Sequence, residues 1–153
     1  ANIFNYPAVT WADVGMIAFY HTMRQTRNRL DSIERNGVTY SLYNVRGTPY
    51  ANFGLLRRDL LQQLGYLDER YRFCAWDPDL SLKVQREAGL KVIGCRAAII
   101  YHDELMDNRK TEEVSVAAED NGRLFAKWNL PEKHSYDDPA PAYQRMLRDR
   151  GLT

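Results

Sequence analysis

Hydrophobic and polar positions alternate along the chain in short blocks that predict both strands and helices. Residues 14–19 form an uninterrupted apolar run, which indicates a buried strand. The pair Asn36-Gly37 lies between alternating residues and favours a tight hairpin, because both central residues of such a turn need a positive φ. We therefore expect strands on both sides of this pair, with a helix over 22–34 as the competing prediction.

The remaining pattern predicts a mixture of helices and strands. A strand is expected at 50–56, where Gly54 would permit a close backbone approach. Asp77 suits the N-cap of a helix that ends at Gly89. The other expected elements are a short helix over 59–64 ended by Gly65, two strands at 90–95 and 97–101, a longer helix over 111–128, and a last short helix up to residue 150. This mixture predicts a mixed α/β fold, with a central sheet and flanking helices.

Composition and charge narrow the possible functions. The length of 153 residues suits one domain, and the 44% apolar and 27% charged shares are ordinary for a globular protein. The net charge is +1 and the basic residues are scattered among acids, which argues against a nucleic-acid partner. Because no apolar run reaches the length of a membrane span and no signal peptide opens the chain, we expect a cytoplasmic location, free or at the cytoplasmic face of a membrane.

The two cysteines, Cys74 and Cys95, fit no zinc-binding spacing. We expect two buried thiols in a reducing compartment, and a disulfide between them is the alternative.

The segment from residue 52 to residue 102 carries several motifs in a fixed order. They are Arg57-Arg58, Gly65-Tyr66-Leu67-Asp68-Glu69, Asp77-Pro78-Asp79-Leu80, Lys83, Gly89 and Tyr101-His102. In order and spacing they resemble the second half of the family-2 inverting glycosyltransferases, which have the A-type glycosyltransferase fold. The resemblance is close over a third of the chain and extends loosely to Trp128. Trp76 stands where that family usually has Glu, and Lys83 stands where it often has Arg, which keeps the charge but loses a bidentate fork.

The resemblance implies a partial A-type fold. In that family a nucleotide-binding half, ending in an Asp-x-Asp metal motif, comes first in the chain, and too few residues precede Asn52 to hold it. We therefore expect residues 1–153 to be a single-domain fragment without that half. Residues 50–102 would be the acceptor-side catalytic segment, 103–130 a loop plus helix, and 131–153 a tail.

The resemblance also implies a reaction. A sugar would pass from a nucleoside-diphosphate sugar to a hydroxyl of a carbohydrate or lipid-linked acceptor, with inversion. The acceptor hydroxyl needs a positioned base, and Asp77 aligns with the catalytic base of the family. The departing diphosphate needs positive charge, so a divalent cation, Mn²⁺ or Mg²⁺, is expected, with His102 as a metal ligand. Substrate contacts are expected from Asn52, Phe53, Trp76, Asp79, Lys83, Arg109 and Lys110.

Other interpretations of these residues remain open. Asp77 alone fits a plain helix N-cap, Asp79 an ion-paired helix face with Lys83 and Glu87, and His102 a hydrogen-bonded rim residue. Arg109 and Lys110 fit a solvated loop. The Asp77-Pro78-Asp79 run could itself be the metal motif, or its two acids could serve a phosphatase-like enzyme. The main alternative for the chain is a non-catalytic glycosyltransferase-like module that binds sugar or protein.

Overall fold

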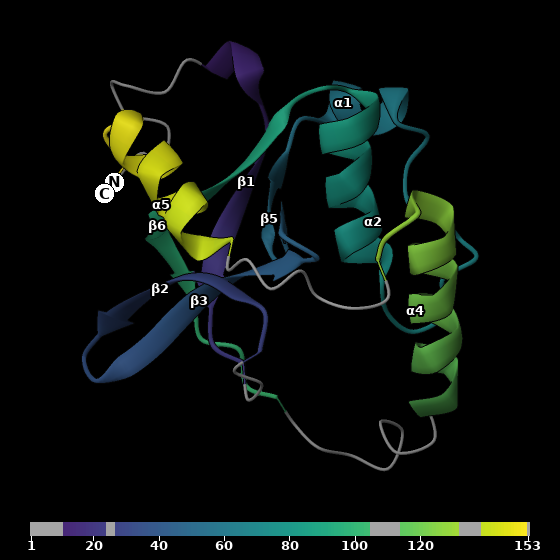
Figure 1. The fold of residues 1–153 in the computed structure, drawn as a ribbon, viewed down its shortest axis with the longest axis horizontal. Helices are drawn as coiled ribbons and strands as arrows, with labels where there is room; N and C mark the ends of the chain where they lie inside the picture. Colours follow the sequence, from purple (N-terminus) through teal and green to yellow (C-terminus); the bar gives the residue numbers. More distant parts are fainter. Residues whose placement is uncertain (1–10, 24–26, 105–113, 132–138, 153) are drawn as a thin grey trace.

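The computed structural model describes residues 11–23, 27–104, 114–131 and 139–152. This part of the chain is mixed α/β, with a curled sheet and helices packed beside it (Figure 1). The predicted central sheet with flanking helices is therefore confirmed. The strands are β1 (Val14–His21), β2 (Arg29–Arg35), β3 (Val38–Val45), β4 (Thr48–Tyr50), β5 (Gly54–Leu56) and β6 (Lys91–Ile100). The helical elements are η1 (Trp11–Asp13), α1 (Arg58–Gln63), α2 (Trp76–Leu82), η2 (Lys83–Glu87), α4 (Val114–Trp128) and α5 (Ala140–Asp149).

Strand β1 is the centre of the sheet and contains the apolar run predicted at 14–19. It pairs in parallel with β6 over its whole length and antiparallel with β5 through Met16–Ala18. At its end, His21 pairs with Ser41 of β3. The two strands predicted at 90–95 and 97–101 are one strand, β6. Its pairing with β1 shifts register between Phe19 and Tyr20, and this irregularity lies where the sequence suggested a break.

The predicted hairpin is confirmed, and the competing helix over 22–34 is wrong. Asn36 and Gly37 have φ angles of 52° and 75°, and β2 and β3 pair antiparallel on either side. The predicted strand at 50–56 divides into β4, which pairs with β3, and β5, which pairs with β1. A Cβ on Gly54 would lie 2.3 Å from the carbonyl oxygen of Ile17, so the predicted close backbone approach is confirmed. The division leaves Asn52 and Phe53 in the connection between two strands.

The helices begin and end close to their predicted bounds. Gly65 (φ 73°) and Gly89 (φ 67°) end α1 and the α2–η2 helix, as expected for left-handed glycines. Helix α2 starts earlier than predicted, because its N-cap is Ala75, which has a φ of 71° and makes no side-chain cap hydrogen bond. Asp77 therefore lies inside the first turn, and its interpretation as a plain N-cap is wrong.

Two hydrophobic clusters hold these elements together. The larger one fills the space between the sheet and helices α1, α2 and α5, with Tyr20, Leu42, Val84, Ile93 and Leu147 among its most buried members. The smaller one joins α4 to α2 and consists of Tyr71, Ala75, Leu82, Leu124 and Leu130. Figure 1 shows α4 alongside α2, with α5 on the other side of the molecule. Each helix thus buries its apolar face against a defined partner.

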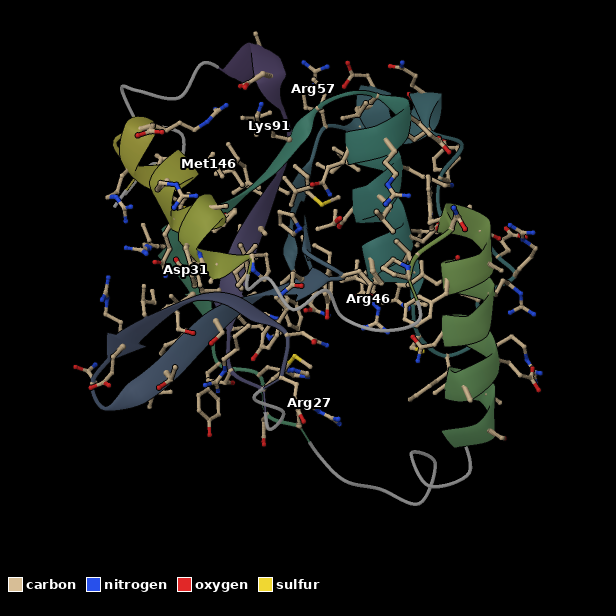
Figure 2. All side chains as sticks on the ribbon, in the orientation of Figure 1. Arg27, Asp31, Arg46, Arg57, Lys91 and Met146 are labelled. Atoms are coloured by element: carbon tan, nitrogen blue, oxygen red, sulfur yellow. The ribbon has the colours of Figure 1, made fainter. Side chains whose placement is uncertain are left out.

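A buried carboxylate joins three strands of the sheet, β1, β2 and β6. Asp31 of β2 lies beneath α5 (Figure 2) and is 4% exposed. Arg96 donates to both of its carboxylate oxygens, each over 2.9 Å, and Tyr20 donates to it as well. Because an isolated charge is costly in the interior, these donors are what allow Asp31 to be buried there.

Among the residues that the structure describes, no helix combines the length and apolar character needed to cross a membrane.

Candidate functional site

Four chain segments meet at the carboxyl ends of the parallel strands β1 and β6. They enclose a pocket of about 220 Å³ lined by His21, Met23, Asn52, Phe53, Trp76, Asp77 and His102. His21 ends β1 and Met23 follows it, His102 follows β6, Asn52 and Phe53 connect β4 to β5, and Trp76 and Asp77 begin α2. The carboxyl ends of parallel strands are a common ligand-binding position, because the loops after such strands converge there. Five residues that the sequence selected, Asn52, Phe53, Trp76, Asp77 and His102, are brought together in this pocket.

Asp77 is the acidic group of the pocket. Its Oδ2 atom accepts a hydrogen bond from Nδ2 of Asn52. Burial raises the pKa of the Asp77 carboxyl to about 6, and the opposing hydrogen bonds from its own backbone and from Asn52 do not cancel this effect. A carboxylate with such a pKa is ionised for the most part at neutral pH, yet is a stronger base than an exposed aspartate.

His21 is the most buried residue of this cluster and contacts Asn52. It is 2% exposed, and its Nε2 atom lies 2.9 Å from Oδ1 of Asn52, while Nδ1 lies 3.1 Å from the carbonyl oxygen of Thr22. Its ring packs against Tyr43 and Phe53, each with a centroid distance of 5.0 Å. Burial lowers the pKa of His21. Asn52 therefore bridges a buried imidazole and the Asp77 carboxylate.

His102 lines the same pocket, with its ring centroid 5.3 Å from that of Phe53 and 6.2 Å from that of His21. Its backbone is tied to Thr22, whose Oγ1 exchanges hydrogen bonds with the His102 N–H and C=O at 2.8 and 3.1 Å. Its Nδ1 atom is buried without a hydrogen-bond partner and lies 3.9 Å from Oε1 of Glu104. A buried ring nitrogen of this kind can bind a cation, and Mg²⁺ held together with a diphosphate usually takes only one or two protein ligands. Among the described residues, no three His, Cys, Asp or Glu side chains come together, so a cation here would take its other ligands from substrate and water.

Asp79, predicted as a substrate contact, lies away from this pocket. It is 1% exposed and accepts hydrogen bonds from Nε1 of Trp128 at 2.7 Å and from the Tyr71 hydroxyl at 3.1 Å. Nζ of Lys127 lies 2.8 Å from Oδ1. This carboxylate fastens α4 to α2, and the predicted pairing of Asp79 with Lys83 is replaced by the pair with Lys127. Asp77 and Asp79 do not share a pocket, which disfavours both the metal-motif and the phosphatase-like interpretations.

Lys83, also predicted as a substrate contact, holds the turn after α1. It is 8% exposed, and its Nζ donates to the carbonyl oxygens of Leu64 and Tyr66 at 3.3 and 2.8 Å. Tyr66 has a φ of 62°, so the lysine satisfies carbonyls in a turn with left-handed backbone. Arg109 and Lys110 fall outside the described residues, and their contacts with substrate stay predictions.

The loop before α2 is anchored by a buried acid that the sequence interpretation missed. Asp120 of α4 is fully buried and accepts backbone hydrogen bonds from Arg72, Phe73 and Cys74, at 3.0, 2.7 and 2.9 Å to Oδ2. These backbone donors hold the pKa of Asp120 below its usual value, although burial alone would raise it. These hydrogen bonds fix the loop that leads into α2 to helix α4.

Sequence reasoning also missed His21, which lines the pocket. The signal was present, because His21 follows the apolar run of β1 as His102 follows that of β6. Only the parallel pairing of these two strands reveals that both histidines reach the same pocket.

Two other hollows lie along the sheet, one away from this pocket and one beside it. An apolar cleft of about 380 Å³ lies along Val14–Ile17 and Leu55–Arg57, near the other end of β1, where Figure 2 labels Arg57. A groove of about 450 Å³ adjoins the site, because Met23 and His102 line both. It continues past Asp103 and Glu104 and along the start of β3. The second hollow extends the space open to a ligand beside Asp77.

No protein-family model, curated protein or solved structure matches this chain.

Proposed function

We propose that this chain is the acceptor-side portion of an inverting glycosyltransferase that uses a nucleoside-diphosphate sugar, with Asp77 as the general base. One observation carries the proposal. The residues that the motif order selects, Asn52, Phe53, Trp76, Asp77 and His102, line a single pocket although they come from three separate segments.

Sugar transfer requires a general base beside the acceptor hydroxyl. The acceptor hydroxyl gives its proton to the Asp77 carboxylate, and its oxygen attacks the anomeric carbon from the face opposite the leaving group. The bond from that carbon to the diphosphate oxygen breaks, and its electron pair leaves with the nucleoside diphosphate. The raised pKa of Asp77, about 6, supports this role because the carboxylate is ionised at neutral pH and still accepts a proton readily.

The dimensions and lining of the pocket suit a sugar ring. A volume of about 220 Å³ is below the ~300–1,000 Å³ of pockets for drug-sized ligands, so it favours a single ring. Phe53 and the 44%-exposed Trp76 provide apolar faces beside polar groups. The adjoining groove leaves room for the rest of a carbohydrate or lipid-linked acceptor.

The proposal includes a partial A-type fold, together with the expected divalent cation. Bound Mn²⁺ or Mg²⁺ would offset the charge growing on the diphosphate. His102 and Glu104 are the described groups nearest to such a role, and no step above depends on them.

The test is sugar transfer by the natural full-length protein and its Asp77→Asn variant. Release of nucleoside diphosphate is followed with UDP-, GDP- and dTDP-sugars, Mn²⁺ or Mg²⁺, and monosaccharide and polyprenyl-linked acceptors. Asp77→Asn should lower kcat by about 10²–10⁴-fold, the usual contribution of a general base. The matched control is Asp59→Asn on α1, whose side chain is 72% exposed, and it should leave kcat unchanged.

Unchanged kcat in Asp77→Asn would rule out the assignment of the base. Sugar binding without turnover by the wild-type protein would favour the non-catalytic binding module instead.

A further inference from the structure

Asn52 presents different atoms to the two groups that it bridges. Its Oδ1 faces Nε2 of His21 at 2.9 Å, while its Nδ2 donates to Oδ2 of Asp77. The other ring nitrogen of His21, Nδ1, faces the carbonyl oxygen of Thr22 at 3.1 Å. Because His21 is 2% exposed, water cannot easily replace either partner of its ring.

The orientation of the Asn52 amide determines whether its nitrogen or its oxygen faces the Asp77 carboxyl. An amide oxygen only accepts hydrogen bonds and an amide nitrogen only donates them. When a hydrogen on Nε2 of His21 engages the oxygen of Asn52, the amide nitrogen is turned toward Asp77. If the amide rotates by half a turn, its oxygen faces Asp77 instead, and that contact is favourable only when the carboxyl carries a proton.

We propose that His21 is a positioning residue that, through Asn52, keeps a hydrogen-bond donor turned toward the Asp77 carboxylate. This inference rests on the proposed function for its catalytic meaning, because a base must be unprotonated when the acceptor arrives. This arrangement requires a hydrogen on Nε2 of His21, which fixes the Asn52 oxygen on His21 and the Asn52 nitrogen on Asp77. A hydrogen on Nδ1 alone would donate to Thr22, leave Nε2 as an acceptor, and turn the Asn52 oxygen toward Asp77.

Four other side chains lie near the contacts among His21, Asn52 and Asp77. The experiment must distinguish their effects on Asp77 from the effect of His21. His102, with a ring centroid 6.2 Å from that of His21, and Glu104 lie on the side of β6. Tyr50 at the end of β4 interacts with both Asp77 and the side chain of Asn52, and Cys74 before α2 lies near Asp77. Burial, ahead of the charge of Asp77, raises the pKa of Tyr50, and burial likewise raises that of Cys74, so both stay neutral near neutral pH.

Two substitutions of His21 separate hydrogen bonding from charge. Both His21→Gln and His21→Leu remove the imidazole and any charge on it. Only glutamine can place an amide N–H near the position of Nε2 and donate to Asn52. A purely electrostatic or packing role of His21 would therefore affect Asp77 similarly in both variants, whereas the proposed role makes them differ.

The experiment follows the ¹³C chemical shift of the Asp77 carboxyl by NMR between pH 4 and 9 in this 153-residue chain. Asp77→Asn assigns the signal. His21→Gln should titrate as the wild type does, and His21→Leu should titrate about one unit higher, the size expected for losing one charge-assisted hydrogen bond. Asn52→Leu should shift the titration in the same direction as His21→Leu.

Equal titration of Asp77 in His21→Leu and wild type would overturn the proposal, as would equal shifts in the leucine and glutamine variants. If His21→Leu does not fold, His21→Asn replaces it, because the shorter amide reaches the position of Nδ1 but not Asn52. This readout does not use turnover, so it remains decisive even if Asp77→Asn leaves sugar transfer unchanged and the proposed function fails. In an active full-length protein, the acidic limb of the kcat–pH profile should move by the same amount as the titration of Asp77.

Discussion

Replacing Asp120 by asparagine tests whether one buried carboxylate organises the entrance to helix α2. The side chain is fully buried on α4. Its Oδ2 accepts the backbone N–H groups of Arg72, Phe73 and Cys74, and its Oδ1 lies 3.1 Å from Nη1 of Arg123. Asparagine has nearly the same shape, so the substitution changes charge and hydrogen-bonding capacity without opening a cavity.

The expected loss follows from counting these contacts. If the amide oxygen takes the place of Oδ2, the three backbone hydrogen bonds persist but lose their charge assistance, about 1 kcal/mol each. The amide nitrogen then faces the Arg123 guanidinium, donor against donor. Because the Arg123 side chain is 34% exposed, this ion pair adds only about 0.5 kcal/mol. The free energy of unfolding should fall by about 3.5 kcal/mol, and the Tm by about 7–14 °C for a domain of this size.

Urea and thermal unfolding, followed by circular dichroism, measure this loss. The control is Glu119→Gln, an exposed neighbouring carboxylate on the same helix, which should change the free energy of unfolding by less than about 0.5 kcal/mol. A loss below about 1 kcal/mol in Asp120→Asn would refute the argument, because the backbone hydrogen bonds would then not depend on the negative charge.

The pH dependence gives a second check with a fixed sign. The folded-state pKa of Asp120 lies below its ordinary value of 3.8, since its backbone donors outweigh the effect of burial. The unfolded chain therefore binds more protons in acid, and the stabilisation from Asp120 is complete above about pH 4 and is lost as the pH falls further. The stability gap between wild type and Asp120→Asn should narrow in acid.

Three further predictions use the same chain. Gly54→Ala should lower the free energy of unfolding by about 1–3 kcal/mol, because the new Cβ would clash with the carbonyl oxygen of Ile17 in β1. Gly122→Ala, which has open space around the new Cβ, should stabilise α4 by about 0.5–1 kcal/mol. Equal urea midpoints for the two variants would contradict this. Asp77→Asn should raise the Tm relative to wild type more at pH 8 than at pH 4. Burial raises the pKa of Asp77 from 3.8 to about 6, so wild-type stability falls as the pH rises through that window; a constant Tm difference would contradict it. Burial also raises the pKa of Cys74 to about 11, so in a Cys95→Ser background its reaction with a disulfide reagent at pH 7.5 should be about 100-fold slower than that of a free thiol; a rate like that of the unfolded chain would contradict it.

Local signals explain why much of the fold could be predicted. The Asn36-Gly37 hairpin and the helix ends at Gly65 and Gly89 depend on positive φ angles, which these residue types adopt most easily. The apolar run of β1 likewise identifies a strand that is buried on both sides. These features need no knowledge of distant residues, so the pattern of residue types is sufficient. The two cysteines are not joined by a disulfide; Cys95 is buried as predicted, whereas Cys74 is only partly buried.

The candidate site could be predicted only in part. The order of motifs selected Asp77, Asn52 and His102, and the fold brings all three to one pocket. It also selected Asp79 and Lys83, which the fold uses to hold α4 and the turn after α1. Residue type and spacing cannot distinguish an acid that faces a pocket from one that faces a neighbouring helix, because the two lie only two positions apart on the same turn.

What the sequence determined by itself is therefore local: the hairpin, the helix ends, the central strand, and a set of residues suited to one kind of chemistry. The tertiary structure alone decided which of them meet. The parallel pairing of β1 with β6 brings His21 and His102 to the same pocket, across 80 residues of chain, and the docking of α4 places Asp120 beneath the loop before Asp77. Such contacts depend on register and on the packing of distant segments, which no local pattern of residues encodes.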